Sequence, residues 1–255
     1  MSEGSPVPLI ASDQLGDLLG LLKGSDSVEL KLSIDLADQR HTLETLGLDP
    51  LEAQVRLVHF FDTPDLRLQQ AGVVVRARRV QGKGDDTVVK LRPVVPQDLP
   101  EELRADENFK VEVDAMQTGY VCSGSLRAEA REPVRPLLAA GGPLHKLFTK
   151  SQQAFYVEHA PGGVALDDLI ELGPIFVLKL KGKPVGFDHK LVVELWLYPD
   201  GDRILELSTK CLPPEAFQLA AELRTFLADR GIAPGDSQET KTRKALTFFT
   251  AQQGN

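Results

Sequence analysis

Five pairs of charged residues, with one residue between the members of each pair, are the part of this sequence best suited to chemistry. Side chains two positions apart on a β-strand point to the same face, so each pair would place two charges together while its apolar neighbours face the other way. Arginine and lysine bind phosphate oxygens, and carboxylates bind hard divalent cations. Such pairs predict a charged cavity that holds a polyanion and a metal ion. They are Glu29 and Lys31, Arg76 and Arg78, Lys90 and Arg92, Glu112 and Asp114, and Lys179 and Lys181.

Each pair also has an ordinary explanation, because the polar face of a half-buried sheet normally meets water. The pair Arg76 and Arg78 could be surface, for example, since Arg79 is charged and would point to the opposite face. The acidic pair, the mixed pair and the pair Lys179 and Lys181 could likewise be solvated strand faces. Repetition of the pattern on five expected strands favours the cavity.

The elements that must position these pairs are mostly strands. Segments that alternate apolar and charged residues predict strands, and Gly72, Gln81-Gly82-Lys83-Gly84 and Tyr198-Pro199-Asp200-Gly201-Asp202 predict turns between them. We expect strands over residues 27–34, 53–62, 73–80, 86–93, 108–114, 147–158, 163–170, 175–182, 190–198 and 203–208.

Helices are expected at both ends of the chain and between the strands. Leu15, Leu18, Leu19 and Leu22 share one face of the first expected helix, and Pro213-Pro214 opens another. The helices are predicted over residues 12–23, 37–48, 133–140, 213–230 and 237–250, with a loop over 94–104 and a connector over 123–144. Together the elements predict a single α+β domain over 1–255: an eight-stranded, mainly antiparallel, closed or nearly closed β-tunnel over 27–210 with flanking helices.

Charge narrows the class of ligand. The 255 residues carry a net charge of −8, which argues against general nucleic-acid binding. The stretch from Arg76 to Arg92, however, holds six basic residues against two acidic ones. An acidic protein with a locally basic interior fits a small anionic ligand better than a long polymer.

Other features indicate the compartment. No apolar run is long enough to span a bilayer, and no basic segment followed by an apolar stretch opens the sequence. Cys122 and Cys211 have neither metal-ligand nor redox spacing, so we expect free thiols. These patterns predict a cytoplasmic protein with no membrane partner, and they leave its oligomeric state open.

Several short motifs occur in an informative order. They are Val28-Glu29-Leu30-Lys31, His59-Phe60-Phe61-Asp62-Thr63-Pro64-Asp65, Val75-Arg76-Ala77-Arg78, Val88-Val89-Lys90-Leu91-Arg92-Pro93 and Lys110-Val111-Glu112-Val113-Asp114. In this order the chain resembles the CYTH domain, also called the triphosphate tunnel metalloenzyme family, from about Ser27 to the final helix. The resemblance implies an antiparallel eight-stranded tunnel that hydrolyses inorganic or organic triphosphates with Mg²⁺ or Mn²⁺. Some branches of that family are adenylate cyclases or thiamine triphosphatases.

The resemblance and the residue chemistry together give candidate site residues. A triphosphate carries about four negative charges, so it needs several guanidinium and ammonium groups from different strands. The expected substrate-binding residues are Arg76, Arg78, Lys90, Arg92, Lys150, Lys179, Lys181 and Lys210. The expected metal ligands are Glu29, Glu112, Asp114, Glu194 and Glu206. Glu29 and Lys31, which match the family's opening motif, are the expected catalytic positions.

Two departures from the family pattern keep a rival function open. The family opens with Glu-x-Glu-x-Lys, but Ser27 stands at the first position, and a hydroxyl is a poorer ligand for a hard cation. A later Lys-x-Arg is replaced by Lys150-Ser151-Gln152, which removes a bidentate phosphate contact. The alternatives are therefore a non-catalytic polyphosphate- or nucleotide-binding module and an adenylate cyclase.

Four further features have mainly structural interpretations. His59 is expected to be a packing residue, and Asp62-Thr63-Pro64-Asp65 a turn. Trp196 shares strand parity with Glu194, so it would face the tunnel mouth or cap the barrel end. The cluster Lys241, Arg243 and Lys244 fits a solvated helix face, or alternatively a position over one tunnel opening.

Overall fold

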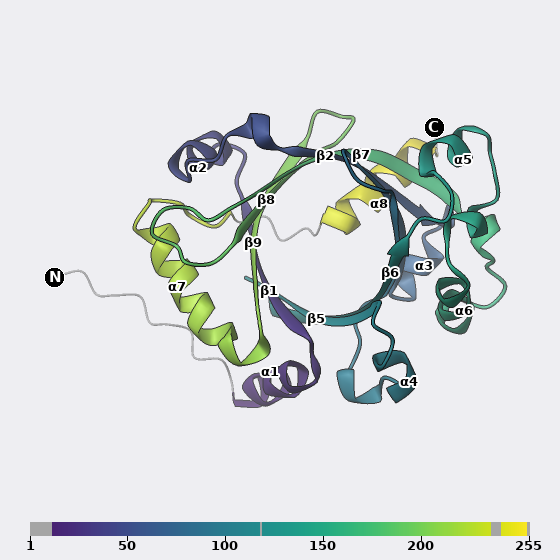
Figure 1. The fold of residues 1–255 in the computed structure, drawn as a ribbon, viewed down its shortest axis with the longest axis horizontal. Coiled ribbons are helices and arrows are strands. Elements are labelled where there is room, and N and C mark those ends of the chain that lie inside the picture. The colour runs from purple at the N-terminus through teal and green to yellow at the C-terminus, as the bar shows by residue number, and fades with distance from the viewer. Residues whose placement is uncertain (1–11, 118, 236–240, 254–255) are drawn as a thin grey trace.

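A closed barrel of β-strands forms the centre of the computed structural model, which describes residues 12–117, 119–235 and 241–253 (Figure 1). Around the ring the strands follow the order β1-β5-β6-β4-β3-β2-β7-β8-β9, and β9 pairs with β1 to close it. All neighbours are antiparallel except β1 and β5, which are parallel. The strands are β1 Ser27–Ile34, β2 Gln54–Asp62, β3 Val73–Val80, β4 Asp86–Leu91, β5 Phe109–Met116, β6 Gly119–Glu129, β7 Ile170–Gly182, β8 Leu191–Leu197 and β9 Arg203–Cys211.

The predicted fold class is confirmed: a mainly antiparallel tunnel with flanking helices. The described residues form nine strands rather than eight. The alternation expected from the sequence explains the closure, since apolar residues on one face of each strand are covered from outside and charged residues line the inside. On β3, for example, Val75 and Ala77 are fully buried against the outer layer, whereas Arg76 and Arg78 face the interior.

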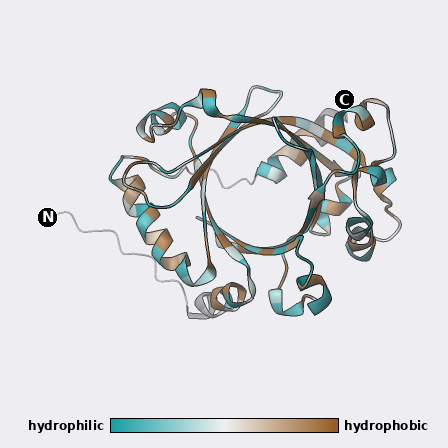
Figure 2. Ribbon diagram, in the orientation of Figure 1, coloured by the Kyte–Doolittle hydropathy of each residue, from teal (hydrophilic) through white to brown (hydrophobic). Residues whose placement is uncertain are grey.

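Helices cover the outer face of the barrel. In Figure 1, α1, α2 and α7 lie on one side of the ring and α3, α5 and α6 on the other. Figure 2 shows hydrophobic and hydrophilic residues mixed along α7, as expected of a helix with one apolar face; Leu219, Leu223 and Phe226 of that face are buried. The helices are α1 Ser12–Gly24, α2 Gln39–Thr45, α3 Arg67–Gln70, α4 Glu101–Arg104, α5 Val134–Ala139, α6 Lys150–His159, α7 Ala216–Ala228 and α8 Lys241–Gln253, with 3-10 turns η1 Pro50–Glu52, η2 Pro96–Asp98, η3 Leu144–Leu147, η4 Leu166–Asp168 and η5 Pro213–Glu215.

Helix α8 differs from the other helices because it packs against residues that face the inside of the barrel. Val58, Val177 and Trp196 line the interior, and Ala245 and Leu246 of α8 are buried in the same apolar cluster as these three. The helix therefore covers part of the interior at one end of the barrel, where it overlaps the ring in Figure 1. The expected helix over 237–250 corresponds to α8, and residues 237–240 lie outside the described part of the chain.

Four expectations for the middle of the chain are wrong. The expected loop over 94–104 contains η2 and α4. Residues 147–158, expected as a strand, contain helix α6, because Thr149 and Gln152 form a capping box that starts a helix there. Residues 163–170 contain η4 rather than a full strand, and β7 begins only at Ile170. The expected connector over 123–144 instead contains most of β6, which pairs with β4 and β5.

No helix in the described ranges combines the length and the apolar character needed to cross a membrane.

Candidate functional site

A cavity of about 1430 Å³ occupies the inside of the barrel, and residues of all nine strands and of α8 line it. The alternating pattern of the sequence accounts for the lining, since the inward residue of each pair of neighbours is commonly charged. The predicted site residues that line it are Glu29, Lys31, Arg76, Arg78, Lys90, Arg92, Glu112, Lys179, Lys181, Glu194, Glu206 and Lys210. Asp114 is fully buried and contacts three of them.

Three carboxylates gather on one wall of this cavity. Glu29, Glu112 and Asp114 each offer an oxygen atom, and these atoms lie within 4.8 Å of one another. The parallel pairing of β1 with β5 brings them together, because Glu29 is in register with Asp114 and Ser27 is in register with Glu112. Ser27 Oγ donates a hydrogen bond of 3.3 Å to Glu112 Oε2, so the serine at the first position of the opening motif lies at the edge of this acidic cluster.

Basic residues surround the acidic cluster. Lys31 Nζ lies 2.7 Å from Asp114 Oδ1 and 3.0 Å from Glu29 Oε2, while Arg92 Nη1 lies 3.2 Å from Asp114 Oδ2. Lys210 pairs with Glu112. Burial raises the pKa of Asp114, but Lys31, Lys90 and Arg92 outweigh it and bring that pKa to about 2. The carboxylate is therefore ionised at neutral pH, and the ion pairs with Lys31 and Arg92 each engage one of its oxygens.

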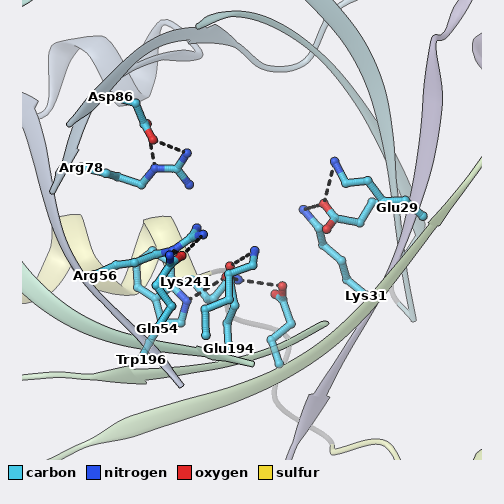
Figure 3. Close-up of polar contacts among 12 residues, drawn as sticks. Glu29, Lys31, Gln54, Arg56, Arg78, Asp86, Glu194, Trp196 and Lys241 are labelled. Atoms are coloured by element: carbon cyan, nitrogen blue, oxygen red, sulfur yellow. Dashed lines mark hydrogen bonds and ion pairs between the residues drawn. The ribbon is translucent and has the colours of Figure 1, made fainter. Parts of the chain in front are cut away.

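Arginines dominate the opposite part of the cavity. Arg78 binds Asp86 through two hydrogen bonds of 2.9 and 3.0 Å, and Arg127 Nη2 lies 2.8 Å from the same carboxylate. Arg56 donates to Gln54 Oε1 at 2.8 and 3.2 Å (Figure 3). Arg76 lies in the same region, and burial followed by repulsion from Arg78 lowers its pKa to about 9.

A third cluster joins β7, β8, β9 and α8. Lys179 Nζ lies 2.6 Å from Glu194 Oε1, and Lys241 Nζ lies 2.6 Å from Glu194 Oε2 and 2.7 Å from Glu206 Oε1 (Figure 3). Trp196 donates from Nε1 to Glu194 Oε2 at 3.3 Å, so its indole faces the interior, as the strand parity allowed. Of the two alternatives for the basic cluster of the last helix, Lys241 takes the position inside the tunnel.

Lys150 is the one predicted site residue that the structure places away from the cavity. It is the first residue of α6, outside the barrel wall, because the expected strand is a helix. Gln152 is fully buried, and its Nε2 donates at 3.1 Å to the carbonyl oxygens of both Thr87 and Leu126. The amide thus fastens α6 to β4 and β6 and does not face the cavity.

Sequence reasoning missed Arg56, Asp86 and Arg127, which line the cavity. Arg127 belongs to β6, which was expected to be a connector, so its alternation was not considered. Asp86 opens the expected strand over 86–93 and shares strand parity with Lys90 and Arg92, and that parity was the available signal. Arg56 lies two residues before Val58 on an expected strand, so the two side chains face the same side. Val58 is paired with Arg78 of β3, which also puts Arg56 on the face that carries the β3 arginines, and this alternation was the available signal.

The structural expectations for other residues are met. His59 is buried with its Nδ1 2.7 Å from Glu171 Oε1. Asp62 accepts hydrogen bonds from the backbone N–H groups of Thr63, Leu68 and Gln69, which confirms the turn. Cys122 and Cys211 are both free thiols.

Comparisons with known proteins establish the fold and no more. No protein-family model and no curated protein sequence matches the chain. A solved structure from Hippeastrum, described as a candidate adenylyl cyclase with a dominant triphosphatase activity, aligns with 86% of this chain and 95% of its own at 18% identity, with a TM-score of 0.63. A candidate adenylate cyclase from Bacillus halodurans aligns with 86% of this chain and 97% of its own at 14% identity, with a TM-score of 0.58. The chain shares the tunnel-like barrel of these proteins.

Proposed function

We propose that this chain is a member of the CYTH, or triphosphate tunnel metalloenzyme, family and hydrolyses an inorganic or organic triphosphate with Mg²⁺ or Mn²⁺. The observation that carries the proposal is a set of cations inside the tunnel that lack close acidic partners. Arg76 Nε is buried and has no hydrogen-bond partner among the described residues. Lys90 Nζ lies 3.8 Å from Asp114 Oδ2, and burial lowers its pKa to about 8. Buried cations of this kind are destabilising unless an anion binds them.

The arrangement suits a compact polyanion. Arg76 and Arg78 on β3, Lys90 on β4 and Lys179 and Lys181 on β7 face one enclosed space. Several charge-assisted hydrogen bonds from different strands match the many oxygens of a triphosphate chain. The closed wall and the cavity of about 1430 Å³ favour a small molecule over a nucleic acid. Organic triphosphates and inorganic tripolyphosphate share this recognition chemistry.

The acidic cluster fits a divalent ion. Its ligands would be Glu29, Glu112 and Asp114, whose oxygen donors suit Mg²⁺ or Mn²⁺. Asp114 supports the assignment, because its carboxylate is fully buried beside Glu29 and Glu112, although Lys31 lies 2.7 Å from one of its oxygens and Arg92 lies 3.2 Å from the other. When bound, such an ion neutralises phosphate charge and helps to orient an attacking water.

The protein's own residues supply binding and charge. Burial lowers the pKa of Lys31, but Asp114 and Glu29 outweigh it and raise that pKa above its ordinary value, so the ammonium stays charged beside the acidic cluster. It would balance charge on the phosphoryl group under attack. Burial raises the pKa of Glu29, yet Lys31 and Lys210 bring it below its usual range. An ionised Glu29 would accept a hydrogen bond from water near that phosphoryl group.

Phosphate release from tripolyphosphate, ATP and thiamine triphosphate tests the proposal, each measured with Mg²⁺, Mn²⁺ or EDTA. We expect metal-dependent release that falls by about 10²-fold in kcat/KM for Arg76→Ala, since one electrostatic contact to the transferred group is lost. Arg79→Ala is the matched control, because Arg79 lies on the same strand with an exposed side chain. Equal turnover by the native protein and Arg76→Ala would contradict the proposal.

Ser27 supports one rival function. Its hydroxyl, not a carboxylate, contacts Glu112, which weakens the donor set for a hard cation and favours a tunnel that binds polyphosphate or nucleotide without turnover. The adenylate cyclase alternative gives pyrophosphate and a cyclic nucleotide from ATP. Product analysis of the same assays separates hydrolysis, cyclisation and binding without product.

A further inference from the structure

Two carboxylates inside the tunnel face each other across neighbouring strands. Glu194 of β8 is directly in register with Glu206 of β9, and both side chains line the cavity. Like charges opposite each other on a sheet destabilise it. A cation must therefore hold this pair together.

Lysine ammonium groups already perform this role. Lys241 Nζ bridges Glu194 Oε2 and Glu206 Oε1 at 2.6 and 2.7 Å, and Lys179 Nζ binds the remaining oxygen of Glu194 at 2.6 Å. Two carboxylates and two ammonium groups give a neutral cluster. Burial raises the pKa of Glu194, but Lys241 and Lys179 outweigh it and hold that pKa well below its usual range.

The position of the bridging ammonium is set by helix α8. Lys241 is the first residue of that helix, and its backbone carbonyl accepts a hydrogen bond of 3.1 Å from the Tyr198 hydroxyl. Its Nζ lies 5.0 Å from the centroid of the Trp196 ring, within cation–π range. One turn further on, Ala245 and Leu246 are buried against the inner apolar cluster, so the helix cannot shift without exposing them.

The two acidic clusters differ in the number of carboxylates that they bring together. Glu194 and Glu206 are two carboxylates bridged by Lys241, whereas Lys31, which lies 3.0 Å from Glu29 and 2.7 Å from Asp114, stands among three. Only Glu29, Glu112 and Asp114 bring three carboxylates of the described chain within 4.8 Å of one another. A metal ion at Glu194 and Glu206 would have to displace a lysine that is anchored by its helix.

We propose that Lys241 is a built-in cation that takes the place of a second divalent ion at Glu194 and Glu206, so that the tunnel binds metal only at Glu29, Glu112 and Asp114. The inference rests on the proposed use of a divalent ion and revises the predicted ligand role of Glu194 and Glu206. The helix that covers one end of the barrel thereby contributes part of the charge that the chemistry requires.

Counting bound Mn²⁺ tests the inference without any turnover. Calorimetry and electron paramagnetic resonance on the full-length protein, without triphosphate, should give one Mn²⁺ per chain, lost in Glu112→Gln and kept in Glu206→Gln. Lys241→Met should double the count to two, because it leaves Glu206 without its lysine partner. The double variant Lys241→Met/Glu206→Gln should return to one.

Lys244→Met is the matched control, since Lys244 is on the same helix but pairs with Asp202 and does not line the cavity. It should bind one ion. Three results would overturn the inference. The native protein could bind two Mn²⁺ ions and Glu206→Gln only one, the native protein could bind none, or a folded Lys241→Met variant could still bind one. The comparison of the native protein with Glu206→Gln decides the matter even if Lys241→Met does not fold. Failure to hydrolyse triphosphates leaves these counts unaffected and would refute only the proposed function.

Discussion

Arg76 is the residue whose position is hardest to explain without a ligand. Its side chain is half-buried, with a buried Nε, and burial followed by repulsion from Arg78 lowers its pKa to about 9. Lys90 is in a related state, since burial lowers its pKa to about 8 and its Nζ lies 3.8 Å from Asp114 Oδ2. A protein that keeps several such cations gives up stability for binding, which is common at functional sites.

Replacing Arg76 should therefore have opposite effects on stability and on binding. Arg76→Met keeps much of the side-chain volume and removes the buried charge, so we expect unchanged or higher stability of the ligand-free protein, by about 0 to 2 kcal/mol. Tripolyphosphate binding should weaken by at least tenfold. Urea unfolding and calorimetry measure the two quantities, with Arg79→Met as the exposed control on the same strand. A variant that loses stability and keeps full affinity would contradict the role given to Arg76.

The lowered pKa of Lys90 predicts a pH dependence. A triphosphate binds the charged ammonium, so affinity should fall as pH rises through about 8. The stability of the ligand-free protein should change with pH in the opposite direction. The pKa of Lys90 in the folded protein lies below the ordinary 10.5, so the unfolded chain keeps this proton to higher pH. The free energy of unfolding should therefore rise between about pH 8 and 10.5. Binding and unfolding measured across this range check both trends. Lys90→Arg stays charged, so it should shift the loss of affinity to higher pH.

Ser27 offers a gain-of-function test at the acidic cluster. Ser27→Glu would place a further carboxylate beside Glu112, where the serine Oγ now lies 3.3 Å from that side chain. We expect Mn²⁺ to bind about tenfold more tightly, because affinity rises with the number of charged ligands, and the metal-free protein to lose stability. Ser151→Glu, on the exposed face of α6, is the control. Unchanged Mn²⁺ affinity would place the metal elsewhere.

At the scale of elements, α6 shows how a residue can resemble a site residue and yet be structural. Gln152 closes the capping box at the start of the helix and also binds the carbonyl oxygens of Thr87 and Leu126 through the outer face of the sheet. Its oxygen accepts a hydrogen bond of 2.9 Å from Thr87 Oγ1. The amide therefore joins α6 to two strands that carry cavity residues on their opposite faces.

Gln152→Ala should destabilise the protein by about 2 to 3 kcal/mol, because it leaves buried polar groups unpaired. Activity per folded molecule should not change, since the side chain does not reach the cavity. Ser151→Ala is the exposed control, expected to change stability by about 0.5 kcal/mol or less. Thermal unfolding and activity at a temperature where both variants are folded distinguish this structural role from a phosphate contact, which would lower activity in the folded protein.

The elements themselves were predictable where alternation was strict. On β1, β3, β4 and β5 the charged residue at every second position gave both the strand and its inward face. Residues 119–129 and 150–159 could not be assigned in this way. β6 contains Gly124 beneath the ring of Phe109 and has small residues where alternation would normally be visible. Helix α6 has only a weak apolar face. The capping box at Thr149 was the available signal for the helix. Pairing partners, such as the parallel contact of β1 with β5, depend on the whole barrel.

At the scale of the whole molecule, the tunnel should respond to its ligand as a unit. Tripolyphosphate pairs with cations on several strands at once, so at 100 times its dissociation constant it should stabilise the folded protein by about 2.7 kcal/mol. Scanning calorimetry with and without tripolyphosphate measures the shift in melting temperature. In Arg76→Met the shift should be smaller at the same concentration, and raising the salt concentration should reduce it in both proteins. An equal shift in the two proteins would mean that the ligand binds outside this cluster.

The seam of the barrel has a consequence for how the protein is made. β1 Ser27–Ile34 pairs with β9 Arg203–Cys211, so the first strand of the barrel acquires one of its two neighbours only after the other barrel strands have been translated. Until then β1 has an open edge, a potential template for association with other chains. Contacts this distant in sequence also slow folding. A nascent chain that stalls before residue 203 would hold Glu29, Glu112 and Asp114 on paired strands. It would lack a closed ring, and the edge of β1 that normally pairs with β9 would stay exposed.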